Sequence, residues 1–94
     1  MAYKVFLGVG HGGTDTGAVA DGYREKDMTL VMALACQEEL VRHGVLVRLS
    51  RTKDENDPVN EEVRECNAYA PDLALDIHVN AGGGDGFEAY YTIG

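Results

Sequence analysis

Two of the three histidines of this chain, together with one glutamate, could form a metal site. His11 lies in the glycine-rich segment Gly10–Gly13, Glu25 follows a second glycine-rich stretch, and His78 lies much further along the chain. Two imidazole nitrogens and one carboxylate oxygen, with a fourth position left for water, form a ligand set of catalytic zinc. The alternative is that each histidine is a hydrogen-bonded structural residue. Spacing leaves both readings open, because the three residues form no local motif.

The sequence predicts four strands that could position these residues. Short β-rich runs bounded by glycine, proline or polar residues indicate a strand at each place. The predicted strands cover residues 3–9, 45–49, 73–79 and 87–93. Residues 10–24 are expected to form a long loop and residues 80–86 a glycine-rich turn.

Two helices are predicted between these strands. Over residues 25–43, Leu30, Val31, Leu34, Ala35 and Val41 recur at helical spacing, and a glycine follows where a helix-ending glycine belongs. The second helix is expected to carry Pro58 at its first position, capped by Asp57, and to end before Pro71.

This order of elements predicts an α/β fold, a βαβαββ core with a mostly parallel sheet and helices packed on its faces. In such sheets, ligands gather beyond the carboxyl ends of the strands. His11 follows the first strand, His78 ends the third, and Glu25 closes the loop before the first helix. We therefore expect the three side chains to converge at the carboxyl end of the sheet.

A competing motif overlaps the first histidine. The run from Gly8 to Gly13 satisfies G-x-G-x-x-G directly after a strand, as in dinucleotide-binding folds. That motif requires a helix to open at its third glycine, whereas Thr14–Gly22 holds two more glycines and does not indicate a helix. The second strand also ends without an acidic residue for a ribose, so we disfavour this interpretation.

Composition excludes several classes of protein. The 94 residues carry 16 acidic and 8 basic side chains, a net charge of −8, with no basic patch for nucleic acid. No apolar run approaches the ~20 residues that cross a bilayer, and the start of the chain does not resemble a secretory signal. Cys36 and Cys66 are expected to be reduced and buried. A solvated helix face is expected for the acidic cluster of Asp54, Glu55, Asp57, Glu61, Glu62 and Glu65.

Four segments in order resemble the zinc-dependent N-acetylmuramoyl-L-alanine amidases of the third amidase type. They are Gly10-His11-Gly12-Gly13-Thr14-Asp15-Thr16-Gly17-Ala18, Arg24-Glu25-Lys26-Asp27, Arg64 with Asn67-Ala68, and Ile77-His78-Val79-Asn80-Ala81. The resemblance implies that His11, Glu25 and His78 hold Zn²⁺. It also implies that Asn80 contacts substrate. Residues 1–94 resemble the N-terminal part of the catalytic domain, so we expect a partial domain that is a truncated product, a fragment or a divergent minimal form.

The reaction that the resemblance implies is hydrolysis of the amide between N-acetylmuramic acid and L-alanine in peptidoglycan. Family members carry a catalytic glutamate near the C-terminal end of the domain, and this sequence holds no position that matches it. Glu88 is expected to have a structural or exposed role instead. Asp76 shares a strand face with His78 and could orient an imidazole, although a solvent-facing role is favoured. Asp15 is expected to order the first loop, and His43 to lie on the surface at a helix end.

Two hypotheses of different classes follow. The leading one is a peptidoglycan amidase that binds zinc and is weakly active or inactive as this chain alone. The alternative is a non-catalytic zinc- or muropeptide-binding module. The expected partner is peptidoglycan or a muropeptide, with no nucleic acid or membrane partner. The protein is expected to be made in the cytoplasm, to act on the bacterial cell wall, and to self-associate through an open sheet edge.

Overall fold

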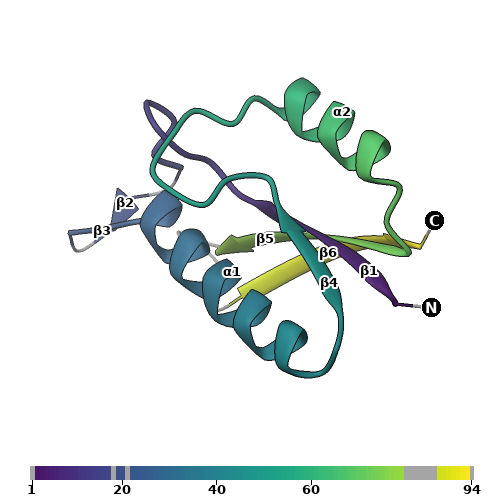
Figure 1. Cartoon of the computed structure of the whole chain (residues 1–94). Helices are drawn as coiled ribbons and strands as arrows, with labels where there is room; N and C mark the ends of the chain where they lie inside the picture. Colours follow the sequence, from purple (N-terminus) through teal and green to yellow (C-terminus); the bar gives the residue numbers. More distant parts are fainter. Residues whose placement is uncertain (1, 18, 21, 80–86, 94) are drawn as a thin grey trace.

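The computed structural model describes residues 2–17, 19–20, 22–79 and 87–93. Its main elements follow the predicted βαβαββ order, with two short strands, β2 and β3, added before the first helix (Figure 1). They are β1 (Lys4–Val9), β2 (Val19–Ala20), β3 (Tyr23–Arg24), α1 (Glu25–Arg42), β4 (Leu46–Leu49), α2 (Val59–Tyr69), β5 (Leu73–Val79) and β6 (Phe87–Ile93).

Four strands form one sheet in the order β4-β1-β5-β6. The central strand β1 runs parallel to both β4 and β5, with Leu7 opposite Leu49 on one side and Leu75 on the other. Strand β6 pairs antiparallel with β5. The predicted α/β class with a mostly parallel sheet is therefore confirmed. In the described part of the chain β4 and β6 are the outer strands, and self-association through such an edge stays a prediction.

The hydrophobic core lies between α1 and one face of the sheet. Val5, Leu7 and Val9 alternate along β1 toward this face, and they pack with Ala33 of α1 and Ile77 of β5. Phe6 points to the other face, where its ring lies 6.5 Å from that of Tyr69 in α2. The two helices thus cover opposite faces of the sheet, and Figure 1 shows the sheet between them.

Not all of the apolar residues that predicted α1 face the core. Val31 and Val41 are 68% and 54% exposed, and Leu34 is also exposed. The inward side is instead formed by Ala33, with partly buried Leu30 packed beside it. Apolar residues lie around much of this helix, so their spacing predicted a helix without showing which side is buried. No described helix is long and apolar enough to span a bilayer.

The predicted start of the second helix was wrong. Helix α2 begins at Val59, with Pro58 as its N-cap in an extended conformation, and Asp57 makes no capping hydrogen bond. The helix ends at Tyr69, and Ala70 then turns the chain with a left-handed φ of 52°. Asp57 makes a different contact, because its carboxyl group is hydrogen-bonded to the side chain of Ser50, directly after β4.

Two smaller expectations also change. The segment between β1 and α1 is not wholly irregular, because β2 and β3 pair within it as a short antiparallel ladder. Cys36 and Cys66 are free thiols as expected, but both are half-buried rather than buried. Partial burial raises the pKa of both thiols. The expected turn at residues 80–86 lies outside the described residues.

A pair of carboxyl groups lies between α2 and the sheet. Glu62 of α2 is hydrogen-bonded to Asp76 of β5, and burial together with this neighbour raises the pKa of Glu62 to about 8. Both carboxyl groups lie against Gly8 of β1, where a Cβ atom would collide with them. At neutral pH Glu62 therefore keeps its proton and shares it with Asp76.

This pair predicts a pH dependence of folding stability. The unfolded chain loses the Glu62 proton near its ordinary pKa of 4.5, while the folded chain keeps it up to about 8. The folded state binds more protons between these values, so its free energy of unfolding falls as the pH rises through this window. Glu62→Gln keeps a hydrogen-bond donor and cannot ionise, so its urea-unfolding free energy should fall less between pH 5 and pH 8.

The matched control is Glu61→Gln on the exposed side of the same helix, which should follow the wild-type pH profile. All three proteins are measured with a chelator present, because metal binding is itself pH-dependent. Parallel profiles for the wild type and Glu62→Gln would show that Glu62 does not hold its proton in the folded state.

Candidate metal centre

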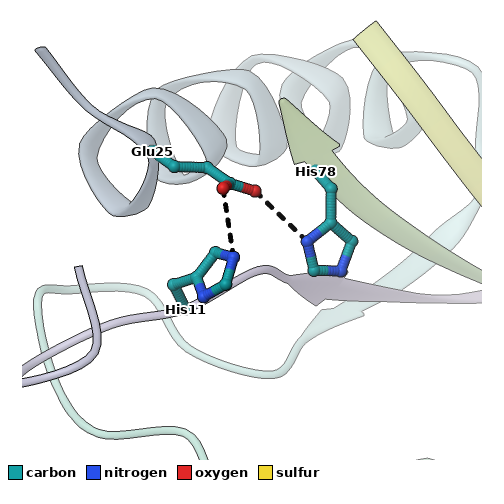
Figure 2. Close-up of side chains that lie close together, drawn as sticks. All are labelled: His11, Glu25 and His78. Carbon is teal, nitrogen blue, oxygen red and sulfur yellow. Dashed lines mark hydrogen bonds and ion pairs between the residues drawn. The ribbon is translucent and has the colours of Figure 1, made fainter. Parts of the chain in front are cut away.

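His11, Glu25 and His78 come together at the carboxyl end of the sheet, as the strand order predicted. The Glu25 carboxylate lies between the two imidazoles (Figure 2). Its Oε1 atom is 3.1 Å from Nε2 of His11, and its Oε2 atom is 3.3 Å from Nδ1 of His78. The imidazole rings are edge to face with centroids 5.4 Å apart. The three side chains thus form one compact cluster of nitrogen and oxygen donors.

The pairing of β1 with β5 sets this geometry. Val9 lies opposite Ile77, and the amide N–H of Gly10 continues the ladder by donating to the Ile77 carbonyl at 3.0 Å. His11 and His78 therefore leave neighbouring parallel strands at the same end. Glu25 joins them because α1 begins there, and the Lys26 amide donates to the Thr16 carbonyl at 3.0 Å.

Glycines make room for both imidazoles. A Cβ atom on Gly10 would lie 2.6 Å from Nδ1 of His78, and one on Gly17 would lie 2.5 Å from Cδ2 of His11. Gly17 also has a positive φ of 68°. Larger residues at either position would displace a donor ring, so these glycines serve the cluster directly.

The backbone of His11 is itself strained. Its φ is 65°, in the left-handed region, at a cost of about 1–2 kcal/mol for a residue with a Cβ atom. Strained residues persist only where surrounding contacts hold them, and they concentrate at functional sites. From this backbone, the Nε2 atom of His11 lies 3.1 Å from Oε1 of Glu25.

Asp15 orients the His11 ring from its other side. Its Oδ2 atom is 3.0 Å from Nδ1 of His11, and its Oδ1 atom accepts from the Gly17 amide at 3.2 Å. These hydrogen bonds, with the histidine first, lower the pKa of Asp15 and keep it ionised. The expectation that Asp15 orders the first loop is confirmed. An Nδ1–H directed at Asp15 leaves Nε2 as the atom that faces Glu25.

The cluster suits a small cation. Glu25 is buried, with a side chain 8% exposed, and both of its oxygens face imidazole nitrogens. With its Nδ1–H directed at Asp15, His11 presents the Nε2 lone pair to Glu25, and a cation between the two could accept from both. One donor atom from each residue lies within 4.8 Å of the others, so the cluster could hold a metal ion. Tetrahedral zinc with bonds of 2.0–2.1 Å places neighbouring ligands about 3.3 Å apart.

Lys26 makes contacts that the sequence did not predict, and these hold the loop beside His11 in place. The Lys26 ammonium donates to Asp54 at 2.8 Å and to the Gly13 carbonyl at 3.0 Å, while the Gly13 amide donates to Asp54 at 2.8 Å. The lysine, followed by the Gly13 amide, lowers the pKa of Asp54. Asp54, Asp57 and Glu62 thus have specific partners, and the acidic cluster is not simply a solvated helix face.

A polar pocket of about 270 Å³ opens next to this loop. Its wall includes His11 and Asp15 on one side and Asn56 on the other. The Asn56 side-chain oxygen accepts from the Thr14 amide at 2.9 Å, so the two loops that form the pocket are joined to each other. A ligand in this pocket would touch a candidate metal-binding residue.

The remaining candidates take other positions. Asp76 is exposed, as the favoured solvent-facing role predicted, and its carboxyl group is hydrogen-bonded to Glu62. His43 is exposed at the end of α1 and contacts Glu39 at 3.2 Å, in agreement with the expected surface role. Asn80 lies outside the described residues. Glu88 is opposite His78 in the β5–β6 register, and its side chain is outside the description.

Comparison with known sequences points to one family. A family profile described as N-acetylmuramoyl-L-alanine amidase matches residues 5–93. The N-acetylmuramoyl-L-alanine amidase CwlM of Bacillus licheniformis is 46% identical over 89 residues, which cover 93% of this chain and 35% of that protein. An endolysin of Bacillus phage SPP1 is 40% identical over 92 residues, covering 96% of this chain and 34% of that protein. The chain spans about a third of the length of these relatives.

Solved structures give the same answer. Cwp6 from Clostridium difficile superposes with a TM-score of 0.86 at 37% identity, covering 92% of this chain and 14% of that one. The catalytic domain of CwlV, an N-acetylmuramoyl-L-alanine amidase from Bacillus (Paenibacillus) polymyxa, gives a TM-score of 0.82 at 28% identity. That match covers 87% of this chain and 48% of the other. Sequence and fold together show that the chain belongs to the N-acetylmuramoyl-L-alanine amidase family.

Proposed function

We propose that this chain is part of the catalytic domain of a zinc-dependent peptidoglycan amidase, with His11, Glu25 and His78 as the metal ligands. The reaction is hydrolysis of the amide bond between N-acetylmuramic acid and L-alanine, in the bacterial cell wall. The observation that carries the proposal is the convergence of three chemically suitable donors, in a chain whose family profile names that amide.

The donor set fits zinc better than calcium or magnesium. Imidazole nitrogen is a common ligand of zinc, whereas calcium and magnesium prefer shells of oxygen ligands. Three protein donors leave a position for substrate or water, as in catalytic rather than structural sites. Zinc bound there would supply a Lewis acid that polarises a carbonyl group and acidifies water.

The surrounding residues prepare the ligands and the approach. Asp15 accepts from Nδ1 of His11, which fixes the ring and directs Nε2 toward Glu25. Glu25 holds the centre of the cluster, and its burial limits competition from solvent. The pocket beside His11 and Asn56 gives an acyl or peptide group a place next to the cluster. Asn80 is proposed to contact substrate on the strength of the resemblance alone. We assign no residue of this chain as general base.

Zinc content tests the ligand set directly. Purified protein reconstituted with zinc and desalted should retain about one zinc per chain by elemental analysis, because three preorganised donors bind more tightly than any one of them. His11→Ala and His78→Ala should each lose most of it. The control is His43→Ala, since this third histidine is 71% exposed and outside the cluster. Undiminished zinc in both ligand variants would exclude the site.

Asp15, whose carboxylate is hydrogen-bonded to His11, predicts a partial rather than complete loss of zinc binding. Asp15→Asn should weaken zinc binding by about 10–100-fold, since the amide does not stabilise the donor tautomer as an ionised carboxylate does. Competition with a chromophoric chelator measures this affinity. Asp27→Asn is the matched control, an exposed aspartate whose ion pair with Arg24 includes none of the three candidate ligands. Equal affinities for Asp15→Asn and the wild type would remove Asp15 from the proposed site.

Digestion of muropeptides distinguishes the amidase hypothesis from the hypothesis of a non-catalytic binding module. With zinc bound, high concentrations of the protein should release stem peptides with a free N-terminal alanine, detected by mass spectrometry. Glu25→Gln should release none, because loss of the central carboxylate dismantles the ligand set. Binding of muropeptides with no released peptide at any concentration would favour the non-catalytic alternative.

A further inference from the structure

Arg51 is a buried cation directly behind the metal cluster. It follows β4 at the same carboxyl end of the sheet and is 2% exposed. Its Nε atom donates to the His11 carbonyl at 2.7 Å, and its Nη2 atom donates to the Lys26 carbonyl at 2.8 Å. Nη2 also lies 3.2 Å from the Gly10 carbonyl, and Nη1 donates to the Lys53 carbonyl at 3.0 Å. One side chain therefore bonds to four carbonyl groups on three segments of backbone, residues 10–11, 26 and 53.

The segments it joins are those that carry the candidate ligands. His11 is a candidate ligand, and Lys26 is the residue next to Glu25. The planar guanidinium holds its donors at fixed angles, so two carbonyl groups bound to it are held at a fixed separation. Arg51 thereby limits how far His11 and Glu25 can move apart.

The hydrogen bond to His11 also falls at a strained point. The same residue whose carbonyl accepts from Nε has the left-handed φ of 65°. A conformation of this kind needs contacts that hold it in place. The arginine supplies such a contact from a buried position that water cannot readily replace.

The hydrogen bonds of Arg51 go to main-chain carbonyl groups, although its charge also acts on the carboxyl groups of Asp54 and Asp57. Among the described residues, no carboxylate forms an ion pair with its guanidinium, although Lys26 and Arg24 both have carboxylate partners. Its acceptors are main-chain carbonyl groups together with the Thr29 hydroxyl, 3.4 Å away. A buried charge satisfied by backbone dipoles organises the backbone, and a lysine with one ammonium could not reach all of these groups.

We propose that Arg51 is a positioning residue for the metal centre. Through the carbonyl groups of His11 and Lys26, it holds His11 and Glu25 at the separation that a shared metal ion requires. This inference rests on the proposed function, because it assumes that the cluster binds zinc. It assigns to Arg51 no contact with the metal or the substrate.

The test compares zinc affinity with fold stability. Zinc affinity is measured by chelator competition, and stability by thermal unfolding of the metal-free protein, for the wild type, Arg51→Lys and Arg51→Gln. We expect Arg51→Lys to bind zinc about 10–100-fold more weakly, the range found when groups that orient ligands are removed. Arg51→Gln should bind zinc at least as weakly as Arg51→Lys. If Arg51→Gln does not fold, the milder Arg51→Lys variant still provides the test.

Two controls separate positioning from general destabilisation. Arg48→Lys changes an exposed arginine of β4, and Leu49→Ala removes core packing beside Arg51 without removing a hydrogen bond to the loop. Leu49→Ala should lower the unfolding temperature while zinc affinity stays within a few-fold of the wild type. The absorption spectrum of the cobalt(II)-substituted protein gives a second readout, since it reports ligand geometry. It should change in Arg51→Lys and not in Leu49→Ala.

The outcomes are distinct. Wild-type affinity and an unchanged cobalt spectrum in Arg51→Lys would overturn the positioning role while leaving the zinc site intact. Loss of affinity in Leu49→Ala as large as in Arg51→Lys would also overturn it, by showing that any loss of stability weakens the site. A wild-type protein that binds no zinc would instead contradict the proposed function itself, and with it the premise of this inference.

Discussion

The structure of this protein is organised around a buried carboxylate that faces two imidazoles. A carboxylate removed from water is costly unless positive charge or hydrogen-bond donors surround it. The groups that face Glu25 are the imidazoles of His11, in the loop after β1, and of His78 in β5. The same requirement explains why the cluster suits a divalent cation, because an ion at its centre would compensate the charge and use all three donors. The positions of β1, β5 and α1 matter to function because they make this one interaction possible.

The backbone around the carboxylate is adapted in ways that favour the site. Gly10 and Gly17 provide space for the imidazoles, and His11 takes a conformation that most residues avoid. Hydrogen bonds from residues outside the cluster hold this strained backbone in place. Lys26 bonds to the loop at Gly13, and Arg51 bonds to the carbonyl of His11 itself. Local strain at His11 is thus offset by contacts from elements that are distant in sequence.

The sequence predicted the elements and the convergence of the candidate ligands because both follow from simple rules. Short β-rich runs bounded by glycine, proline or polar residues located the strands. The rule that ligands gather at the carboxyl ends of parallel strands placed His11 and His78 together. These rules could not predict the tertiary contacts that support the cluster. The sequence assigned no role to Arg51, whose burial accompanies tertiary contacts with residues 10–11 and 26. Asp57 had the residue type of a cap, but a tertiary contact with Ser50 competed with that role. Helix α1 has apolar residues around much of its circumference, so periodicity alone did not define its buried side.

The central claim is that one ion is held by two imidazoles and a carboxylate. X-ray absorption at the zinc edge of the zinc-loaded protein tests this most directly, since it reports the identity and distance of the ligand atoms. We expect about two imidazole nitrogens and one or two further oxygens at about 2.0–2.1 Å, with no sulfur. Sulfur at about 2.3 Å, which would place the ion on Cys36 or Cys66, would contradict it. A shell of oxygens without the scattering of imidazole rings would contradict it equally.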